Sequence, residues 1–176
     1  GTYDLLPIED KKDPWKNTKY WQWLEERIRL ITSRYAIDEI RTPIFEKTEL
    51  FARGVGEGTD IVSKEMYTFM DKGNRSLTLR PEGTACVMRS LIEKNLYHQY
   101  SLLKLYYIGP MFRYERPQAG RFRQHMQFGV EVVGSSSPYQ DAELIDLVYN
   151  LYSDLGLKNL TLHLNSVGTS ECRANY

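Results

Sequence analysis

Polar side chains suited to binding or acid–base chemistry gather in residues 121–133. The even-numbered residues of this stretch are apolar except Gln124, which predicts a strand with one face on the core and one polar face. Gly129 leaves a gap in the polar row, where a flat ligand could approach the backbone. A half-exposed antiparallel strand alternates in the same way, although a merely solvated face more often carries Lys, Glu, Thr and Ser. The polar row consists of Arg121, Arg123, His125, Gln127, Gly129 and Glu131.

A second candidate pair, Arg113 and Glu115, lies on the preceding predicted strand. The fork of a guanidinium suits a phosphate, and a neighbouring carboxylate can orient it or accept hydrogen bonds from a nucleotide base. The same pair could instead be a cross-strand ion pair at the surface. Arg113 shares a face with Gln127 and Glu131 only if the connecting loop holds an odd number of residues. A loop of about three or five residues centred near 118–119, or a bulge, would achieve this.

The connection between the two strands is basic. Residues 113–123 contain four Arg and one Glu, a net charge of +3, in a chain with 23 basic and 23 acidic residues. Such a loop could contact a phosphodiester backbone, or it is a flexible hairpin tip with solvated arginines. The histidines at 98, 125 and 163 stand alone and form no pair with metal-binding spacing.

The elements that position these residues follow from spacing in the first half of the chain. Asp13 and Pro14 predict the N-cap and first turn of a helix. Residues 37–45 predict a strand that lies at an edge or carries a bulge, because Pro43 cannot donate to a ladder. Glycines at 54, 56 and 58 predict a mobile loop over 53–63 that is neither a dinucleotide fingerprint nor a P-loop. The first helix has a core stripe of Trp21, Leu24, Ile28, Ile31 and Tyr35.

The second half of the chain predicts more hairpins. One spans 65–71 and 76–80, and Thr84 can cap a helix that runs to about residue 95. Strands over 102–116 and 122–133 precede a helix that begins in a capping box at Ser137 and ends at Gly156, and a last strand covers 160–165. The predicted fold class is α+β, with a mainly antiparallel sheet flanked by helices. The two helices have buried stripes of Val87, Met88, Leu91 and Ile92, and of Leu144, Leu147, Val148, Leu151 and Leu155.

Composition limits the class of protein. A chain of 176 residues with 41% hydrophobic types supports a single domain over 1–176. The longest apolar run, 105–112, falls well short of the ~20 residues of a membrane helix, so no membrane partner is expected. Cys86 and Cys172 form no motif, so we expect no disulfide scaffold, no resident metal and a reducing cytosol, with Cys86 in the core. The chain lacks an initial Met and a final stop signal, so we interpret it as a piece of a longer protein.

Five segments occur in a defined order: GTYDLLP at 1–7, EIRTP at 39–43, KEMYTF at 64–69, LRPEGTA at 79–85 and YIGPMFRYERPQAGRFRQ at 107–124. Together they resemble the histidyl-tRNA synthetases, a family of class II aminoacyl-tRNA synthetases, over nearly the whole chain. Segment 39–43 resembles motif 1, whose proline-bearing strand lies at a dimer interface, and segment 107–124 resembles a full motif 2. Each motif is weak singly, but the ordered set is specific.

The resemblance implies a class II catalytic core and a two-step acyl transfer. Histidine and ATP give histidyl-adenylate and pyrophosphate, and the histidyl group then moves to the 3′-terminal ribose of histidine tRNA. By position, Arg113 would hold the α-phosphate as the catalytic residue, Glu115 would meet the adenine end, and Mg²⁺ would accompany the phosphates. A cytoplasmic homodimer formed through the Pro43 strand is also implied. Histidine would be bound by Glu82, Gly83, Thr84, Gln127 and Glu131, and the tRNA acceptor end would be approached by Arg116, Gln118, Arg121 and Arg123.

Two features depart from the family pattern. The family usually has Phe-His where this chain has His125-Met126, which leaves the role of His125 open. The chain also ends before the second histidine-specific signature, motif 3 and the anticodon-binding domain, which supply a second catalytic arginine. We therefore expect little or no aminoacylation by this chain alone and an active parent protein.

Two other functions compete with this one. The synthetase-like regulatory subunit of ATP phosphoribosyltransferase shares the fold and a histidine pocket but charges no tRNA, and the intact loop at 116–121 disfavours it. A dimerising scaffold that uses the Pro43 strand and no substrate is the third. A thermal shift with histidine plus ATP separates the scaffold from the other two, and charging of histidine tRNA separates those two from each other.

Overall fold

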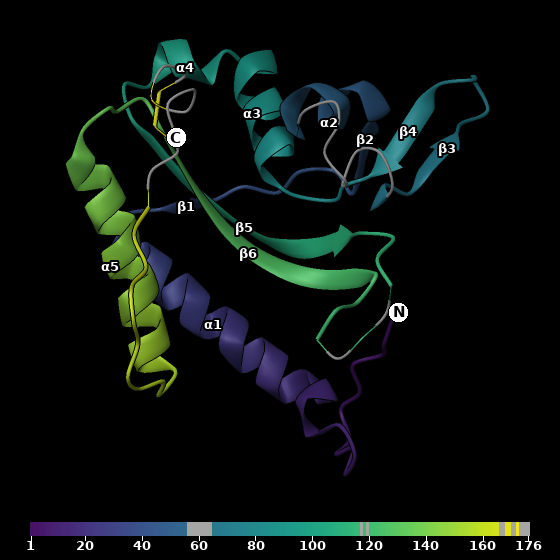
Figure 1. Cartoon of the computed structure of the whole chain (residues 1–176), viewed down its shortest axis with the longest axis vertical. Coiled ribbons are helices and arrows are strands. Elements are labelled where there is room, and N and C mark those ends of the chain that lie inside the picture. Colours follow the sequence, from purple (N-terminus) through teal and green to yellow (C-terminus); the bar gives the residue numbers. More distant parts are fainter. Residues whose placement is uncertain (56–64, 117, 119, 166–167, 170–171, 173–176) are drawn as a thin grey trace.

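The computed structural model describes residues 1–176 except 56–64, 117, 119, 166–167, 170–171 and 173–176. The predicted α+β class is confirmed: a long central hairpin has helices on both of its faces (Figure 1). The helices are the 3₁₀-helix η1 (Pro14–Lys16), α1 (Thr18–Arg34), α2 (Thr48–Val55), α3 (Thr84–Glu93), α4 (Leu96–Gln99) and α5 (Pro138–Asp154). The strands are β1 (Asp38–Glu39), β2 (Phe45–Lys47), β3 (Thr68–Met70), β4 (Ser76–Leu79), β5 (Leu103–Phe112) and β6 (Gln124–Val133).

The strands form two three-stranded sheets. The larger has the order β1-β5-β6, with β1 parallel to β5 and with β5 and β6 antiparallel from the pair Leu103–Val133 to the pair Phe112–Gln124. The smaller has the order β2-β4-β3 and is wholly antiparallel. The single strand predicted over 37–45 is therefore wrong: β1 and β2 are short edge strands of different sheets. Pro43 lies between them, where no ladder hydrogen bond is needed.

The even-numbered face of β6 packs on α1 and α5, as its apolar pattern predicts. Phe128 and Val130 pack against a buried cluster that contains Ile28 and Ile31 of α1 and Leu147 of α5. In Figure 1 both helices lie on the same side of the hairpin. Burying an aliphatic side chain of this size contributes about 1.5–3 kcal/mol, so this cluster holds the hairpin in place. The α5 stripe is narrower than predicted, because Val148 is 41% exposed.

The opposite face of the hairpin packs on α3. Val87 and Leu91 form a second cluster with Tyr107 and Met111 of β5. The predicted α3 stripe is wrong at Ile92, which is 66% exposed because it lies on the side of the helix away from β5. The polar residues of β6 on this face are therefore half-buried.

Three helix starts differ from the predictions. Asp13 makes no capping hydrogen bond through its side chain and precedes only η1, whereas the Asn17 side chain accepts from the Lys19 amide and begins α1. Thr84 is the first residue of α3 and not its cap. Ser137 does accept from the Tyr139 amide at the start of α5. Its capping box is not closed, however, because the Gln140 Oε1 atom is buried without a partner among the described residues.

Other differences concern short elements. The last three residues of α2, 53–55, take up the start of the mobile loop that was predicted over 53–63. Residues 56–64 lie outside the described part of the chain. After α3, Asn95 adopts a left-handed conformation with φ 54° and starts α4, which the sequence did not predict. The strand predicted over 160–165 does not form: no described residue pairs with this segment in a ladder.

The N-terminal segment is attached to the loop end of the central hairpin. The Tyr3 ring centroid lies 4.8 Å from both the Trp15 ring and the Phe122 ring, in edge-on geometry. The carbonyl of Gly1 accepts a hydrogen bond from the Arg123 amide at 2.6 Å. Residues about 120 positions apart therefore fix one end of the loop between β5 and β6. Within the described part of the chain, no helix is long and apolar enough to cross a bilayer.

Candidate functional site

The register of β5 and β6 places the predicted site residues on one face. The Arg113 amide donates to the Arg123 carbonyl at 2.9 Å, which continues the ladder beyond the Phe112–Gln124 pair. Residues directly opposite in an antiparallel pair share a face, so Arg113 lies on the same face as Gln127 and Glu131. The connection has an odd number of residues centred at Gln118, as this shared face requires, but it is longer than the three to five predicted.

Glu131 and the start of α3 form a hydrogen-bonded pair. The Thr84 hydroxyl donates to Glu131 Oε1 at 2.6 Å, and this role replaces the cap that was predicted for Thr84. Glu82 Oε1 accepts from the Ala85 amide at 3.0 Å and supplies the cap instead. Burial raises the pKa of Glu131, with a further contribution from the negative charge of Glu82. Two carboxylates are thus held near each other at the edge of the hairpin.

The gap above Gly129 is filled by a tyrosine ring, so the prediction of a flat ligand over this glycine is wrong. Tyr107 lies directly opposite Gly129 in the ladder and is 5% exposed. A Cβ atom on Gly129 would lie 2.3 Å from the Tyr107 ring, and a Cβ atom on Gly83 would lie 2.2 Å from it. The ring is therefore sandwiched between two glycines. Burial and the Glu131 charge raise the pKa of Tyr107 to about 12, so its hydroxyl keeps its proton near neutral pH.

Gln127 offers an unpaired polar atom on the same face. Its Oε1 atom is buried and has no hydrogen-bond partner among the described residues. Such groups are rare in folded proteins, so this oxygen is free to accept a hydrogen bond from a ligand. His125, two residues earlier, has a pKa lowered by burial and by the positive charge of Arg113. A neutral imidazole and an amide therefore lie between Arg113 and the two carboxylates.

Arg113 is oriented by the segment before α3. Its Nε atom donates to the Pro81 carbonyl at 2.9 Å. Within the described part of the chain its guanidinium forms no ion pair, so its charge is available to an anionic ligand. Pro81 immediately precedes Glu82, and Thr84 contacts Glu131. One short segment, 81–84, thus links the arginine at one end of the face to the carboxylate at the other.

The arginines of the loop differ in their surroundings. Arg121 pairs with Glu115 at 3.4 Å, and the Glu115 side chain is only 19% exposed. The Arg123 guanidinium stacks over the Tyr114 ring at 4.3 Å and donates to the Glu115 carbonyl. Arg116 and Gln118 are exposed. The Arg121 side chain is also 63% exposed, so three of the four predicted tRNA contacts are open to solvent, while Arg121 and Arg123 also stabilise the loop.

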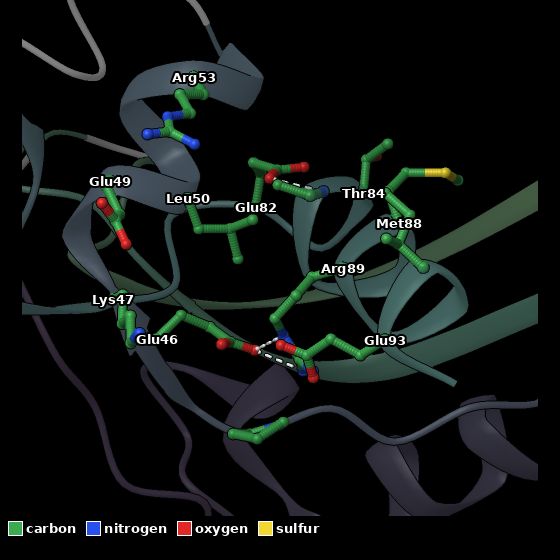
Figure 2. A pocket seen from close by; sticks show the side chains of 13 residues that line it. Glu46, Lys47, Glu49, Leu50, Arg53, Glu82, Thr84, Met88, Arg89 and Glu93 are labelled. Carbon is green, nitrogen blue, oxygen red and sulfur yellow. Dashed lines mark hydrogen bonds and ion pairs between the residues drawn. The ribbon is translucent and has the colours of Figure 1, made fainter. Parts of the chain in front are cut away.

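A cavity of about 910 Å³ opens between α3 on one side and β2 and α2 on the other (Figure 2). Glu82 and Thr84 belong to its lining, but Arg113, Gln127 and Glu131 do not. Arg89 crosses it and pairs with Glu46 at 2.8 Å and with Glu93 at 2.7 Å, as the dashed lines of Figure 2 show. The cavity therefore borders the predicted site at the start of α3 and does not contain it.

No resident metal site is formed by the residues that the structure describes. They contain no group of three or more His, Cys, Asp or Glu side chains placed to hold an ion. Cys86 is completely buried, in agreement with its predicted place in the core, and burial raises the pKa of its thiol to about 12.

Two residues of the site were missed by the sequence reasoning. Tyr107 was treated only as part of an apolar strand, although its odd number places it on the polar face opposite Gly129. Arg80 was not considered, although it is 6% exposed and lies beside Pro81. A guanidinium between Leu79 and Pro81, inside the segment LRPEGTA, is a signal that could have identified it.

Comparison with known proteins agrees with this geometry. An apo histidyl-tRNA synthetase of S. aureus superposes with a TM-score of 0.79 at 44% identity and covers 99% of this chain and 38% of its own. An ATP phosphoribosyltransferase regulatory subunit/histidyl-tRNA synthetase from Bacillus halodurans has a TM-score of 0.69 at 23% identity over 90% of this chain and 38% of its own, which shows a shared fold alone.

The sequence comparisons define the family. A family model described as histidyl-tRNA synthetase matches residues 13–171, and the chain belongs to that family. It is 58% identical over its whole length to the histidine–tRNA ligase of Protochlamydia amoebophila and 61% identical to that of Desulfitobacterium hafniense. It covers 41% and 40% of those two proteins, so the chain spans about two fifths of the length of these curated relatives.

Proposed function

We propose that this chain is part of the catalytic core of a histidine–tRNA ligase, and that the full-length protein activates L-histidine with ATP and transfers the histidyl group to histidine tRNA. The observation that carries the proposal is the single face on which Arg113, the unpaired Gln127 oxygen and Glu131 lie together. An amino acid joined to a nucleotide needs a cation for its phosphate and acceptors for its ammonium and ring N–H groups. This face offers both kinds of group, and membership of the family supports the same substrate.

In the first step, a carboxylate oxygen of histidine attacks the α-phosphorus of ATP. The new O–P bond forms as the bond to the pyrophosphate oxygen breaks, and both reacting oxygens must lie nearly in line. The Arg113 guanidinium neutralises negative charge on the α-phosphate, and its bond to the Pro81 carbonyl fixes it beforehand. Glu131 and Glu82 bind the cationic and N–H groups of histidine, with Thr84 orienting Glu131.

In the second step, a ribose hydroxyl of the tRNA attacks the activated carbonyl and AMP leaves. We assign the approach of the acceptor end to Arg116 and Gln118, with Arg121 and Arg123 shaping the loop. Mg²⁺ is expected to accompany the ATP phosphates, and no step here is assigned to it. We also infer that two copies associate through the Pro43 segment in the cytoplasm, a state that sedimentation of the full-length protein tests.

Histidine-dependent exchange of labelled pyrophosphate into ATP tests the first step. The full-length protein should exchange, and Arg113→Ala should lower kcat by about 10²–10³-fold, as expected for loss of one group that stabilises developing charge. Arg75→Ala is the matched control, because Arg75 lies in an exposed hairpin turn and pairs with Asp71, away from the candidate site. Equal exchange by Arg113→Ala and by the wild type would refute the assignment.

The competing functions give different results. A regulatory subunit of ATP phosphoribosyltransferase would bind histidine but charge no tRNA, and a scaffold would show no thermal shift with histidine and ATP. The chain 1–176 alone should show little or no exchange, because it spans only about two fifths of the length of its curated relatives. Robust exchange by 1–176 would refute that last prediction without affecting the function of the full-length protein.

A further inference from the structure

Arg80 is a buried cation held by neutral groups of two separate segments. Its side chain is almost completely buried, and its Nε atom donates to the Pro110 carbonyl of β5 at 2.9 Å. Its Nη1 atom donates to the Thr42 carbonyl at 3.0 Å and to the Thr42 hydroxyl at 3.1 Å. Within the described residues it forms no ion pair with a carboxylate. Burying a charge in this way is costly, so the geometry of the guanidinium fork must matter here.

The fork joins the segment before β2 to the strand that leads to Arg113. Thr42 is adjacent to Pro43, in the link between β1 and β2, and Pro110 lies near the end of β5. A Cβ atom on Gly109 would come within 2.2 Å of Arg80 Nη2, so the missing side chain of Gly109 makes room for the guanidinium against β5. The contact therefore needs the residue types at three positions that are distant in sequence.

The backbone of Arg80 continues the same connection. Its amide donates to the Ile44 carbonyl at 2.9 Å, and its carbonyl accepts from the Phe112 amide at 2.9 Å. The next carbonyl in the chain, that of Pro81, is the one that accepts from Arg113 Nε. A displacement of Arg80 would therefore move both the backbone beside Arg113 and the acceptor that orients its guanidinium.

We propose that Arg80 is a positioning residue for Arg113 and fixes it relative to the Thr42–Pro43 segment. The inference rests on the proposed function of Arg113 in adenylate formation. Lysine cannot replace it, because an ammonium on a flexible stem cannot make the planar, divergent bonds to Thr42 and Pro110 together. Since small displacements of a catalytic group lower rates by up to about 10²-fold, Arg80 should act mainly on kcat.

The test is a double-mutant cycle in the full-length protein, measured by histidine-dependent pyrophosphate exchange. We expect Arg80→Lys to lower kcat by about 10–100-fold, with KM for histidine changed by less than about twofold. In an Arg113→Ala background, Arg80→Lys should lower kcat by less than about threefold, since the group it positions is gone. An equal loss in both backgrounds would overturn the proposal.

A second readout reports the placement of Arg113 directly. ATP with sulfur in place of one non-bridging α-oxygen exists as two diastereomers, and Arg80→Lys should change the wild-type preference between them by about threefold or more. Arg89→Lys is the matched control: it breaks another partly buried fork, to Glu46, but does not contact Thr42 or Pro110. A similar loss of kcat and of diastereomer preference in Arg89→Lys would show general destabilisation and overturn the proposal.

Two further outcomes are distinguishable. If Arg80→Lys does not fold, Thr42→Val decides, because it removes only the hydroxyl acceptor; it should lower kcat by a smaller factor, about threefold, and no change would overturn the proposal. If the wild-type full-length protein shows no histidine-dependent exchange, the proposed function itself is wrong. If the wild type shows exchange but Arg80→Lys lowers kcat equally in the wild-type and Arg113→Ala backgrounds, only the role of Arg80 is refuted.

Discussion

Adding a single methyl group to Gly129 tests the packing at the centre of the site. In Gly129→Ala the new Cβ atom would lie 2.3 Å from the Tyr107 ring, well inside the closest contact that two such atoms tolerate. The ring cannot move away, because Gly83 touches its other side and the residue is almost completely buried. Overpacking of this kind costs about 1–3 kcal/mol, and for a domain of this size each kcal/mol lowers Tm by about 2–4 °C. We therefore expect Tm to fall by about 2–12 °C.

The assay is thermal unfolding of the full-length protein, followed by tryptophan fluorescence. Gly73→Ala is the control, since its Cβ atom would come no closer than 3.3 Å to Asp71 in an exposed turn, and it should leave Tm nearly unchanged. In a Tyr107→Ala background the ring is absent, so Gly129→Ala should cost almost nothing. An unchanged Tm in the single variant, or an equal loss in both backgrounds, would refute the sandwich as the reason for glycine at this position.

Three other predictions follow from the same geometry. Burial raises the pKa of Glu131 above its value in the unfolded chain, so the folded state binds the proton more tightly. The free energy of unfolding therefore falls as pH rises from the unfolded pKa of this group through its folded pKa. Glu131→Gln should therefore gain Tm relative to the wild type between pH 4 and pH 7 while losing histidine affinity in calorimetry, and a constant Tm difference would contradict this. Tyr3→Ala should lower Tm, because each aromatic pair contributes about 0.5–1.5 kcal/mol, whereas Tyr20→Ala, at 60% exposure, should not. Cys86 should resist alkylation at pH 8 in peptide mapping until the protein unfolds, because its pKa is about 12, and rapid labelling of the native protein would be inconsistent with its burial.

The long elements could be predicted because their patterns are strong. The alternation through β6 and the helical stripe in α1 each depend on several residues that point the same way, and both proved correct. The short elements α2 and α4 could not, because one or two turns of helix leave little periodicity and depend on tertiary contacts. The alternating leucines over 160–165 predicted a strand that finds no ladder partner in the described residues, since a strand pattern does not create its own neighbour.

For the candidate site, the sequence could predict which residues share a face, but it could not predict the side chains that pack between and behind them. For Arg113, Gln127 and Glu131 to share a face, the loop between β5 and β6 had to contain an odd number of residues. The observed register meets this condition. The filling of the Gly129 gap by Tyr107 depends on which residue of β5 lies opposite, and that is set by the loop length, which was underestimated. The role of Arg80 depends on contacts with Thr42 and Pro110, which are distant in sequence.

The attachment of the N-terminal segment has a consequence for how the protein is made. Phe122 is synthesised about 120 residues after its partner Tyr3, and at ribosomal speeds of about 5–20 residues per second this delay is about 6–24 s. During that interval the aromatic side chains of the segment have only Trp15 and Trp21 as neighbours. Emergence of the β5–β6 hairpin from the ribosome is therefore the event that lets Tyr3 dock on Phe122, and chaperones have several seconds in which to meet Tyr3 undocked.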